Sequence, residues 1–105
     1  MNYISPQELK EKLDNNEGTI LLDIREKYEL DICNIGGLHI PMAEVAERVN
    51  EIDVNNEIVV LCRSGRRAVA VANLLTTDFD VQNVRILEGG ILAWIEDVDT
   101  SLEVY

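Results

Sequence analysis

Short apolar runs alternate along the chain with stretches of helical character. The apolar runs cover residues 19–24, 38–40, 58–61 and 84–87. Apolar runs this short are typical of strands that are buried on both faces, as in parallel sheets. Helices are expected after Ser5, over residues 26–32, 43–52 and 68–75, and after Gly90. This alternation predicts an α/β domain with a mostly parallel sheet and helices on both faces.

Two local signals are especially clear. Ser5, Pro6 and Glu8 form the pattern of a capped helix start, with Glu8 three residues after the cap. The strongest strand prediction is the Ile-Val-Val-Leu run at 58–61, which leads directly into Cys62. Because sites in open α/β sheets form beyond the carboxyl ends of strands, Cys62 stands where a functional site is expected.

Length and charge limit the choice of partners. A chain of 105 residues suits one domain, here 1–105. Its formal net charge of −11 repels phosphate backbones and anionic lipids, so we expect neither nucleic acid nor a membrane as a partner. The N-terminus shows no signal-peptide pattern, and two cysteines in such a chain indicate a reducing compartment. We expect a complete, monomeric, cytoplasmic protein.

The segment that follows Cys62 carries the clearest chemistry. It consists of Arg63, Ser64, Gly65, Arg66 and Arg67. Gly65 permits a tight loop whose N–H groups point inward, and the following helix adds the positive end of its dipole. A thiol in such a loop should be largely thiolate near neutral pH, and the arginines can bind a small oxyanion. We therefore predict Cys62 as the catalytic nucleophile and residues 63–67 as its substrate-binding loop.

This loop, Cys-Arg-Ser-Gly-Arg-Arg, resembles the active-site loop of rhodanese-like domains. Three further segments match the family in order and spacing: Leu-Asp-Ile-Arg-Glu at 22–26, Gly-Leu-His-Ile-Pro at 37–41, and Leu-Glu-Gly-Gly through Ala-Trp at 87–94. The resemblance extends over nearly the whole chain. It implies a rhodanese-like fold, a five-stranded and mostly parallel sheet flanked by helices. One departure is Ala68, where many relatives have Ser or Thr, which bears on donor preference.

The resemblance also implies a reaction. Cys62 would accept sulfane sulfur from thiosulfate or from a persulfidated donor protein, and a thiol or cyanide would then take the sulfur from the Cys62 persulfide. Such a double displacement needs an activated nucleophile and no cofactor. No metal site is predicted either, because one histidine and two distant cysteines do not make one.

Other residues are expected to support the loop. Asp23 ends an apolar strand, and a buried carboxylate needs partners, so we expect it to pair with Arg25 or to hold a loop near Cys62. His39 is interpreted as structural, since a preformed thiolate needs no base. Cys33 is interpreted as a packing residue, with a role as resolving thiol as the alternative.

Two other functions fit parts of the pattern. A cysteine phosphatase or arsenate reductase also holds a thiolate in an anion-binding loop, but its Cys-x5-Arg form would place Arg at position 68, which is Ala. A non-catalytic sulfur carrier that docks on partner proteins is the second alternative, and the acidic surface suits protein partners. The sequence leaves the choice between carrier and enzyme open.

Overall fold

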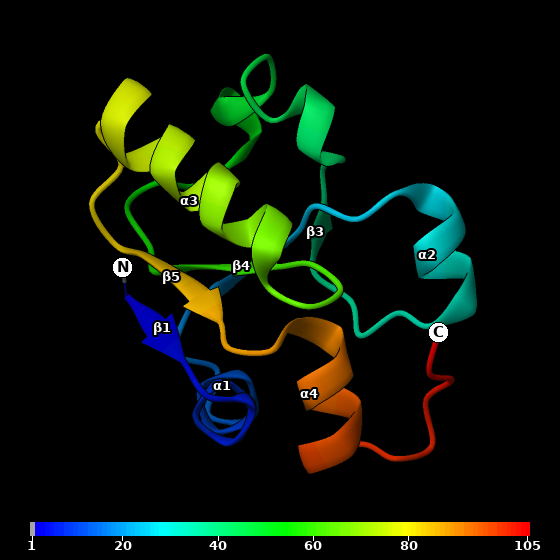
Figure 1. The fold of residues 1–105 in the computed structure, drawn as a ribbon. Helices are drawn as coiled ribbons and strands as arrows, with labels where there is room; N and C mark the ends of the chain where they lie inside the picture. Colours follow the sequence, from blue (N-terminus) through cyan, green and yellow to red (C-terminus); the bar gives the residue numbers. More distant parts are fainter. Residues whose placement is uncertain (1) are drawn as a thin grey trace.

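The computed structural model describes residues 2–105, which form a five-stranded sheet flanked by helices (Figure 1). The elements are β1 (Tyr3–Ile4), α1 (Pro6–Asp14), β2 (Ile20–Asp23), α2 (Lys27–Ile32), β3 (Leu38–His39), two short 3-10 helices (Met42–Glu44 and Val49–Glu51), β4 (Ile58–Leu61), α3 (Arg66–Asp78), β5 (Val84–Leu87) and α4 (Gly90–Asp97). The strand order is β1-β5-β4-β2-β3, and every neighbouring pair is parallel. The α/β architecture predicted from the sequence is therefore confirmed.

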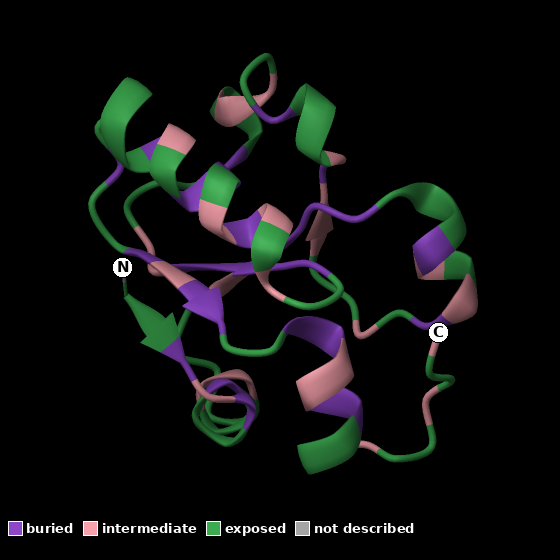
Figure 2. Cartoon of the chain, viewed as in Figure 1, coloured by how far each residue is buried: buried purple, intermediate pink, exposed green. Residues whose placement is uncertain are grey.

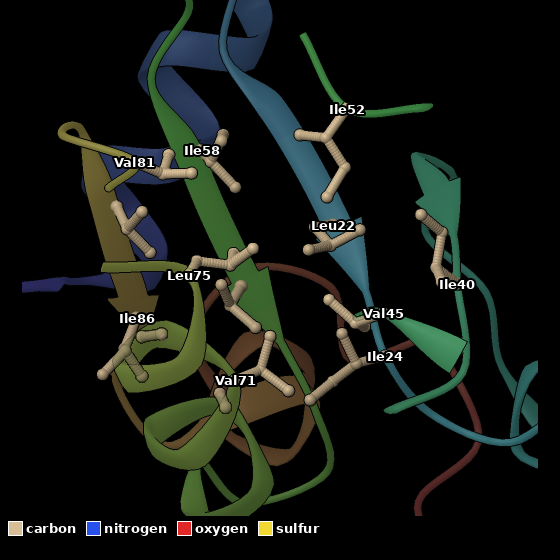
Figure 3. Packing of buried hydrophobic residues seen from close by; sticks show 14 of the residues in the cluster. Leu22, Ile24, Ile40, Val45, Ile52, Ile58, Val71, Leu75, Val81 and Ile86 are labelled. Carbon is tan, nitrogen blue, oxygen red and sulfur yellow. The ribbon is translucent and has the colours of Figure 1, made fainter. Parts of the chain in front are cut away.

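The sheet, whose central strand β4 is buried along its length (Figure 2), separates two hydrophobic cores, and Figure 3 shows side chains of the first. One core lies under α3 and the 3-10 segment, and it includes Val71, Leu75 and Val45. The other lies under α1 and α4, and it includes Leu9 and Trp94. Helices thus cover both faces, as the unbroken apolar strands predicted.

Strand β4 shows why the apolar segments predicted as strands contain no alternating polar residues. Ile58 and Val60 point into the first core, whereas Val59 and Leu61 point into the second. All four residues are fully buried because β4 is the central strand, with β5 and β2 on its sides. The outermost strands, β1 and β3, have two residues each.

The capped helix start is confirmed at α1. Ser5 is the N-cap, and its hydroxyl oxygen accepts a hydrogen bond from the Glu8 N–H at 3.1 Å. Helix α3 is longer than predicted, since it begins at Arg66 and ends at Asp78. Gly65, with φ of 108°, lets the chain turn directly from the loop into this helix.

The predicted helix over residues 43–52 is wrong. The chain forms two separate 3-10 turns there, joined by hydrogen bonds between residues three apart, such as Arg48 N–H to Val45 O at 3.1 Å. Arg48 stabilises this arrangement by pairing with Glu44 in the first turn and Glu51 in the second. Val45 and Ile52 are buried and Val49 is half-buried, so tertiary packing covers these apolar residues without an α-helix.

No helix within residues 2–105 has the length and apolar character needed to cross a membrane.

Candidate active site around Cys62

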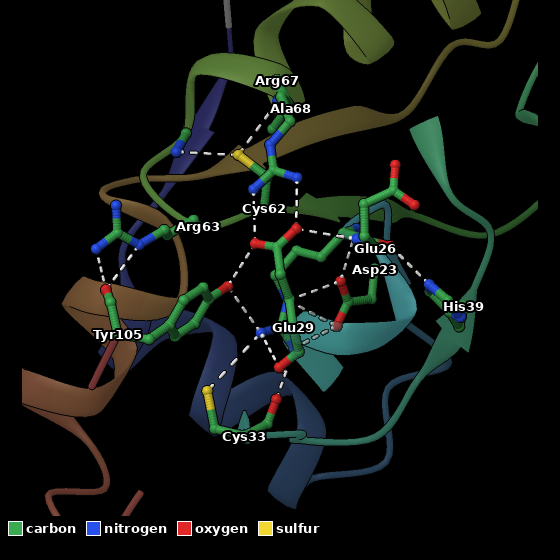
Figure 4. A network of polar contacts seen from close by, with 12 residues as sticks. Asp23, Glu26, Glu29, Cys33, His39, Cys62, Arg63, Arg67, Ala68 and Tyr105 are labelled. Atoms are coloured by element: carbon green, nitrogen blue, oxygen red, sulfur yellow. Dashed lines mark hydrogen bonds and ion pairs between the residues drawn. The ribbon is translucent and has the colours of Figure 1, made fainter. Parts of the chain in front are cut away.

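Cys62 follows the last residue of β4, and its sulfur lies against the N-terminal end of α3. Its Sγ accepts hydrogen bonds from the N–H groups of Gly65 at 3.0 Å and Ala68 at 3.4 Å (Figure 4). The residue is buried, with 1% exposure. First-turn amides of a helix have no intrahelical acceptor, so here they are free to stabilise a negatively charged sulfur. The structure thus builds an N–H cradle around the predicted nucleophile, and Ala68 serves in it through its main chain.

Helix α4 holds the same loop from the other side. The N–H of Ile91 donates to Cys62 O at 2.9 Å, and the N–H of Leu92 donates to Arg63 O at 3.2 Å. Gly90, with φ of 63°, allows this approach, because a Cβ there would meet the carbonyl groups of both loop residues. The loop backbone is therefore fixed between α3 and α4.

Asp23 and Arg25 form a buried ion pair, as expected from the sequence. Arg25 Nη2 lies 2.8 Å from Asp23 Oδ2, and both side chains are at most 1% exposed. Burial alone would lower the pKa of Arg25, but the hydrogen bonds that its guanidinium donates to Asp23 and Tyr105 outweigh burial and raise this pKa. Arg25 also donates to the main-chain O of Cys33 at 2.9 Å and to the Tyr105 hydroxyl at 3.1 Å. The pair ties the end of β2 to α2 and to the last residue of the chain.

Glu29, which the sequence did not single out, lies beside the cysteine loop of residues 62–67. It is 2% exposed, and its carboxylate accepts hydrogen bonds from Nη1 and Nη2 of Arg67 at 2.7 and 2.9 Å. Its Oε2 also accepts the Tyr105 hydroxyl at 2.7 Å. The Arg67 hydrogen bonds lower the pKa of Glu29 to about 2. Its partners Arg67 and Tyr105 are 38 and 76 positions further along the chain, so no local sequence pattern marks Glu29.

The three arginines of the loop have different surroundings. Arg67 pairs with Glu29, as described above. Arg63 donates from Nε to the main-chain O of Tyr105 at 2.7 Å, and its guanidinium lies 5.0 Å from the Tyr105 ring centroid. Arg66 is exposed, and no carboxylate of residues 2–105 pairs with it. Ser64 is exposed at the rim. The cluster therefore presents one uncommitted guanidinium.

Two other candidates lie outside the cradle. The Nε2 of His39 is 2.6 Å from the main-chain O of Arg25, a contact that joins β3 to the end of β2 and fits a structural role. Cys33 is buried in the second core and is a free thiol. Its Sγ lies 3.7 Å from Arg25 Nη1.

The pKa of Glu29 predicts an acid-dependent loss of stability. The carboxyl pKa falls from 4.5 to about 2 on folding, so the ionised form stabilises the fold. This contribution is complete above about pH 4.5 and is lost as the pH falls toward about 2. Its size should be on the order of 2 kcal/mol, since Arg67 is partly exposed. Urea unfolding at several pH values in this range checks the prediction. The free energy of unfolding should depend less steeply on pH in Glu29→Gln than in the unmodified chain, and an equal pH dependence would contradict the assignment.

Comparison with known proteins identifies relatives of this chain. The model of the rhodanese-like domain family matches residues 5–97. A putative sulfurtransferase of Bacillus subtilis, YtwF, is 38% identical over 93 residues, and the match covers 87% of each chain. The putative sulfur carrier protein YrkF of the same organism is 41% identical over 73 residues, which cover 69% of this chain and 40% of YrkF. This chain thus spans less than half the length of YrkF.

The solved structures agree with the sequence relatives. The crystal structure of a rhodanese-like domain protein from Staphylococcus aureus superposes with a TM-score of 0.82 at 26% identity. The superposition covers 100% of this chain and 99% of that one. The fold described above is therefore shared over the full length of a known rhodanese-like domain protein.

Proposed function

This chain belongs to the rhodanese-like family of sulfurtransferases and sulfur carriers, and on that premise we propose that Cys62 accepts sulfane sulfur as a persulfide and passes it to a thiophilic acceptor. The cradle of Gly65 and Ala68 N–H groups at Cys62 Sγ carries this proposal. Such donors stabilise the anionic sulfur before attack and the anionic persulfide after it. Residues 63–67 then act as the binding loop, with Asp23 and Arg25 as its support.

The first step is a displacement at sulfur. The Cys62 thiolate attacks the outer sulfur of thiosulfate, the S–S bond of the donor breaks, and sulfite leaves with the electron pair. With a persulfide donor, the same attack releases the donor's thiolate. In the second step, cyanide or an acceptor thiol attacks the outer sulfur of the Cys62 persulfide and restores the thiolate. No oxidant or cofactor enters either step.

A direct measurement tests the proposal. After incubation with thiosulfate or cysteine persulfide, the intact protein should gain the mass of one sulfur atom, and cyanide should remove it. Steady-state turnover with thiosulfate and cyanide then reports on catalysis. A chain that gains no sulfur from either donor contradicts the proposal.

A sulfur-carrier role is the second candidate. The relative YrkF is itself named a putative sulfur carrier. A carrier would load from a persulfide donor but release the sulfur to cyanide only slowly, so its steady-state turnover with cysteine persulfide and cyanide would be far below that of an enzyme. A phosphatase is not favoured, because the Ala68 side chain has no guanidinium.

We further propose that residues 1–105 act as one domain in the cytoplasm, where thiols remain reduced. The free thiols of Cys33 and Cys62 fit such a setting.

Cys33 should be dispensable for sulfur transfer. It packs in the second core, and its sulfur contacts Arg25 instead of lying in an N–H cradle. Cys33→Ala should keep turnover within about threefold while lowering the free energy of unfolding by roughly 1 kcal/mol. Steady-state kinetics and urea unfolding measure both. A tenfold loss of turnover, with circular dichroism unchanged, would instead assign Cys33 as a resolving thiol.

A further inference from the structure

Two of the three arginines predicted to bind the donor are occupied by groups of the chain itself. Arg63 donates to the main-chain O of Tyr105, and Arg67 donates to Glu29. In Figure 4 the Arg67 guanidinium lies between the Cys62 sulfur and the Glu29 carboxylate. The Glu29 hydrogen bonds raise the pKa of Arg67 most, and the charge of Cys62 contributes as well. The guanidinium is thus near the sulfur but already paired.

The Glu29 carboxylate occupies the Nη1–Nη2 pair of Arg67, through which an oxyanion can bind with two parallel hydrogen bonds. Its two oxygens accept one hydrogen bond each from Nη1 and Nη2. A sulfonate group, such as that of thiosulfate, is recognised through the same parallel pair of N–H donors. An oxyanion that binds Arg67 in this way must therefore first displace Glu29.

The carboxylate is held firmly in this position. Its Oε1 accepts the Glu26 N–H at 3.0 Å, and its Oε2 accepts the Tyr105 hydroxyl at 2.7 Å. Because Oε2 bonds to both Tyr105 and Arg67, moving it away from Arg67 also breaks the Tyr105 contact. Displacement would leave a buried carboxylate with fewer partners, which is costly.

We infer that Glu29 determines donor specificity, by occupying the Arg67 fork and thereby selecting persulfide donors over thiosulfate. The inference rests on the proposed function of Cys62 and adds the class of donor. A dianion meets both the blocked fork and a like charge at Glu29. A persulfide has no oxygen atoms on its leaving sulfur, which departs as a thiolate, so the transfer needs no free guanidinium fork beside that sulfur.

The test compares two donors on single-turnover loading of Cys62, read as the gain of one sulfur by intact mass. The donors are thiosulfate and cysteine persulfide, and the quantity is the ratio of their second-order rates. Glu29→Gln frees one Arg67 donor and removes the charge, so the thiosulfate-to-persulfide ratio should rise roughly ten- to hundred-fold. Tyr105→Phe removes one anchor of the carboxylate and should raise the ratio about threefold.

Glu51→Gln is the matched control. Glu51 also accepts two hydrogen bonds from one arginine, Arg48, at 2.7 and 2.9 Å, but in a separate ion pair. The thiosulfate-to-persulfide ratio of Glu51→Gln should stay within about twofold of the ratio for the unmodified chain. A ratio that is equally unchanged in Glu29→Gln overturns the inference, and Tyr105→Phe decides in the same way if Glu29→Gln does not fold. Absence of loading from both donors in the unmodified chain is a different result, because it removes the proposed function itself.

Discussion

Cys62→Ser should abolish sulfur loading completely. A serine hydroxyl is far less nucleophilic than a thiolate and forms no persulfide, while the cradle around it remains. Intact-mass measurement after incubation with thiosulfate or cysteine persulfide should show no added sulfur. Turnover with cyanide should fall by at least about a thousandfold, to the level without protein.

The variant is informative because its fold should survive. Oγ is smaller than Sγ but can still accept a hydrogen bond from the Gly65 N–H, so the free energy of unfolding should change by about 1–2 kcal/mol at most. Circular dichroism and urea unfolding serve as the control. If the Ser variant still gains one sulfur, Cys33 is the remaining thiol, and the assignment of Cys62 is wrong.

Gly90→Ala should cause a large loss of both stability and loading. The new Cβ would stand 2.7 Å from Cys62 O and closer still to Arg63 O. Either α4 or the cysteine loop must move, and the Ile91 and Leu92 hydrogen bonds to the loop would weaken. Together with the strain at φ of 63°, we expect a loss of about 3 kcal/mol or more.

Gly36→Ala is the matched control for backbone strain. Gly36 also has a positive φ, 90°, but a Cβ there meets nothing within 4 Å. It should cost about 1–2 kcal/mol and leave the rate of sulfur loading unchanged. Equal losses of stability in the two variants would show that α4 does not brace the loop tightly.

The parts of the fold that the sequence predicts well are those fixed by nearby residues. The run at 58–61 could be assigned because every residue is apolar, and β4 has those bounds. The Asp23–Arg25 pair joins residues two positions apart, and burial of a carboxylate at a strand end made a partner necessary. The cysteine loop was recognisable because the loop, its glycine and its helix start are contiguous.

The parts that the sequence did not predict depend on distant contacts. Glu29 lies in a polar stretch of helical character, and only the arrival of Arg67 and Tyr105 makes its carboxylate part of the site. Tyr105 lies beyond the last predicted element. The helix prediction for residues 43–52 is wrong for a related reason. The apolar spacing there suits an α-helix, but two 3-10 turns bury Val45 and Ile52 equally well.

The two-residue length of β1 and β3 limits how this chain can meet another protein. A partner that binds by adding a strand uses the free N–H and C=O groups along the edge of a sheet. Here each edge offers only two residues of such a ladder, whereas the longer strands lie inside. Short edges also protect a sheet against unwanted pairing with other copies. For the proposed transfer at Cys62, we therefore expect a protein that delivers or collects sulfur to recognise side chains of the surrounding loops, so that their charge and shape decide its specificity.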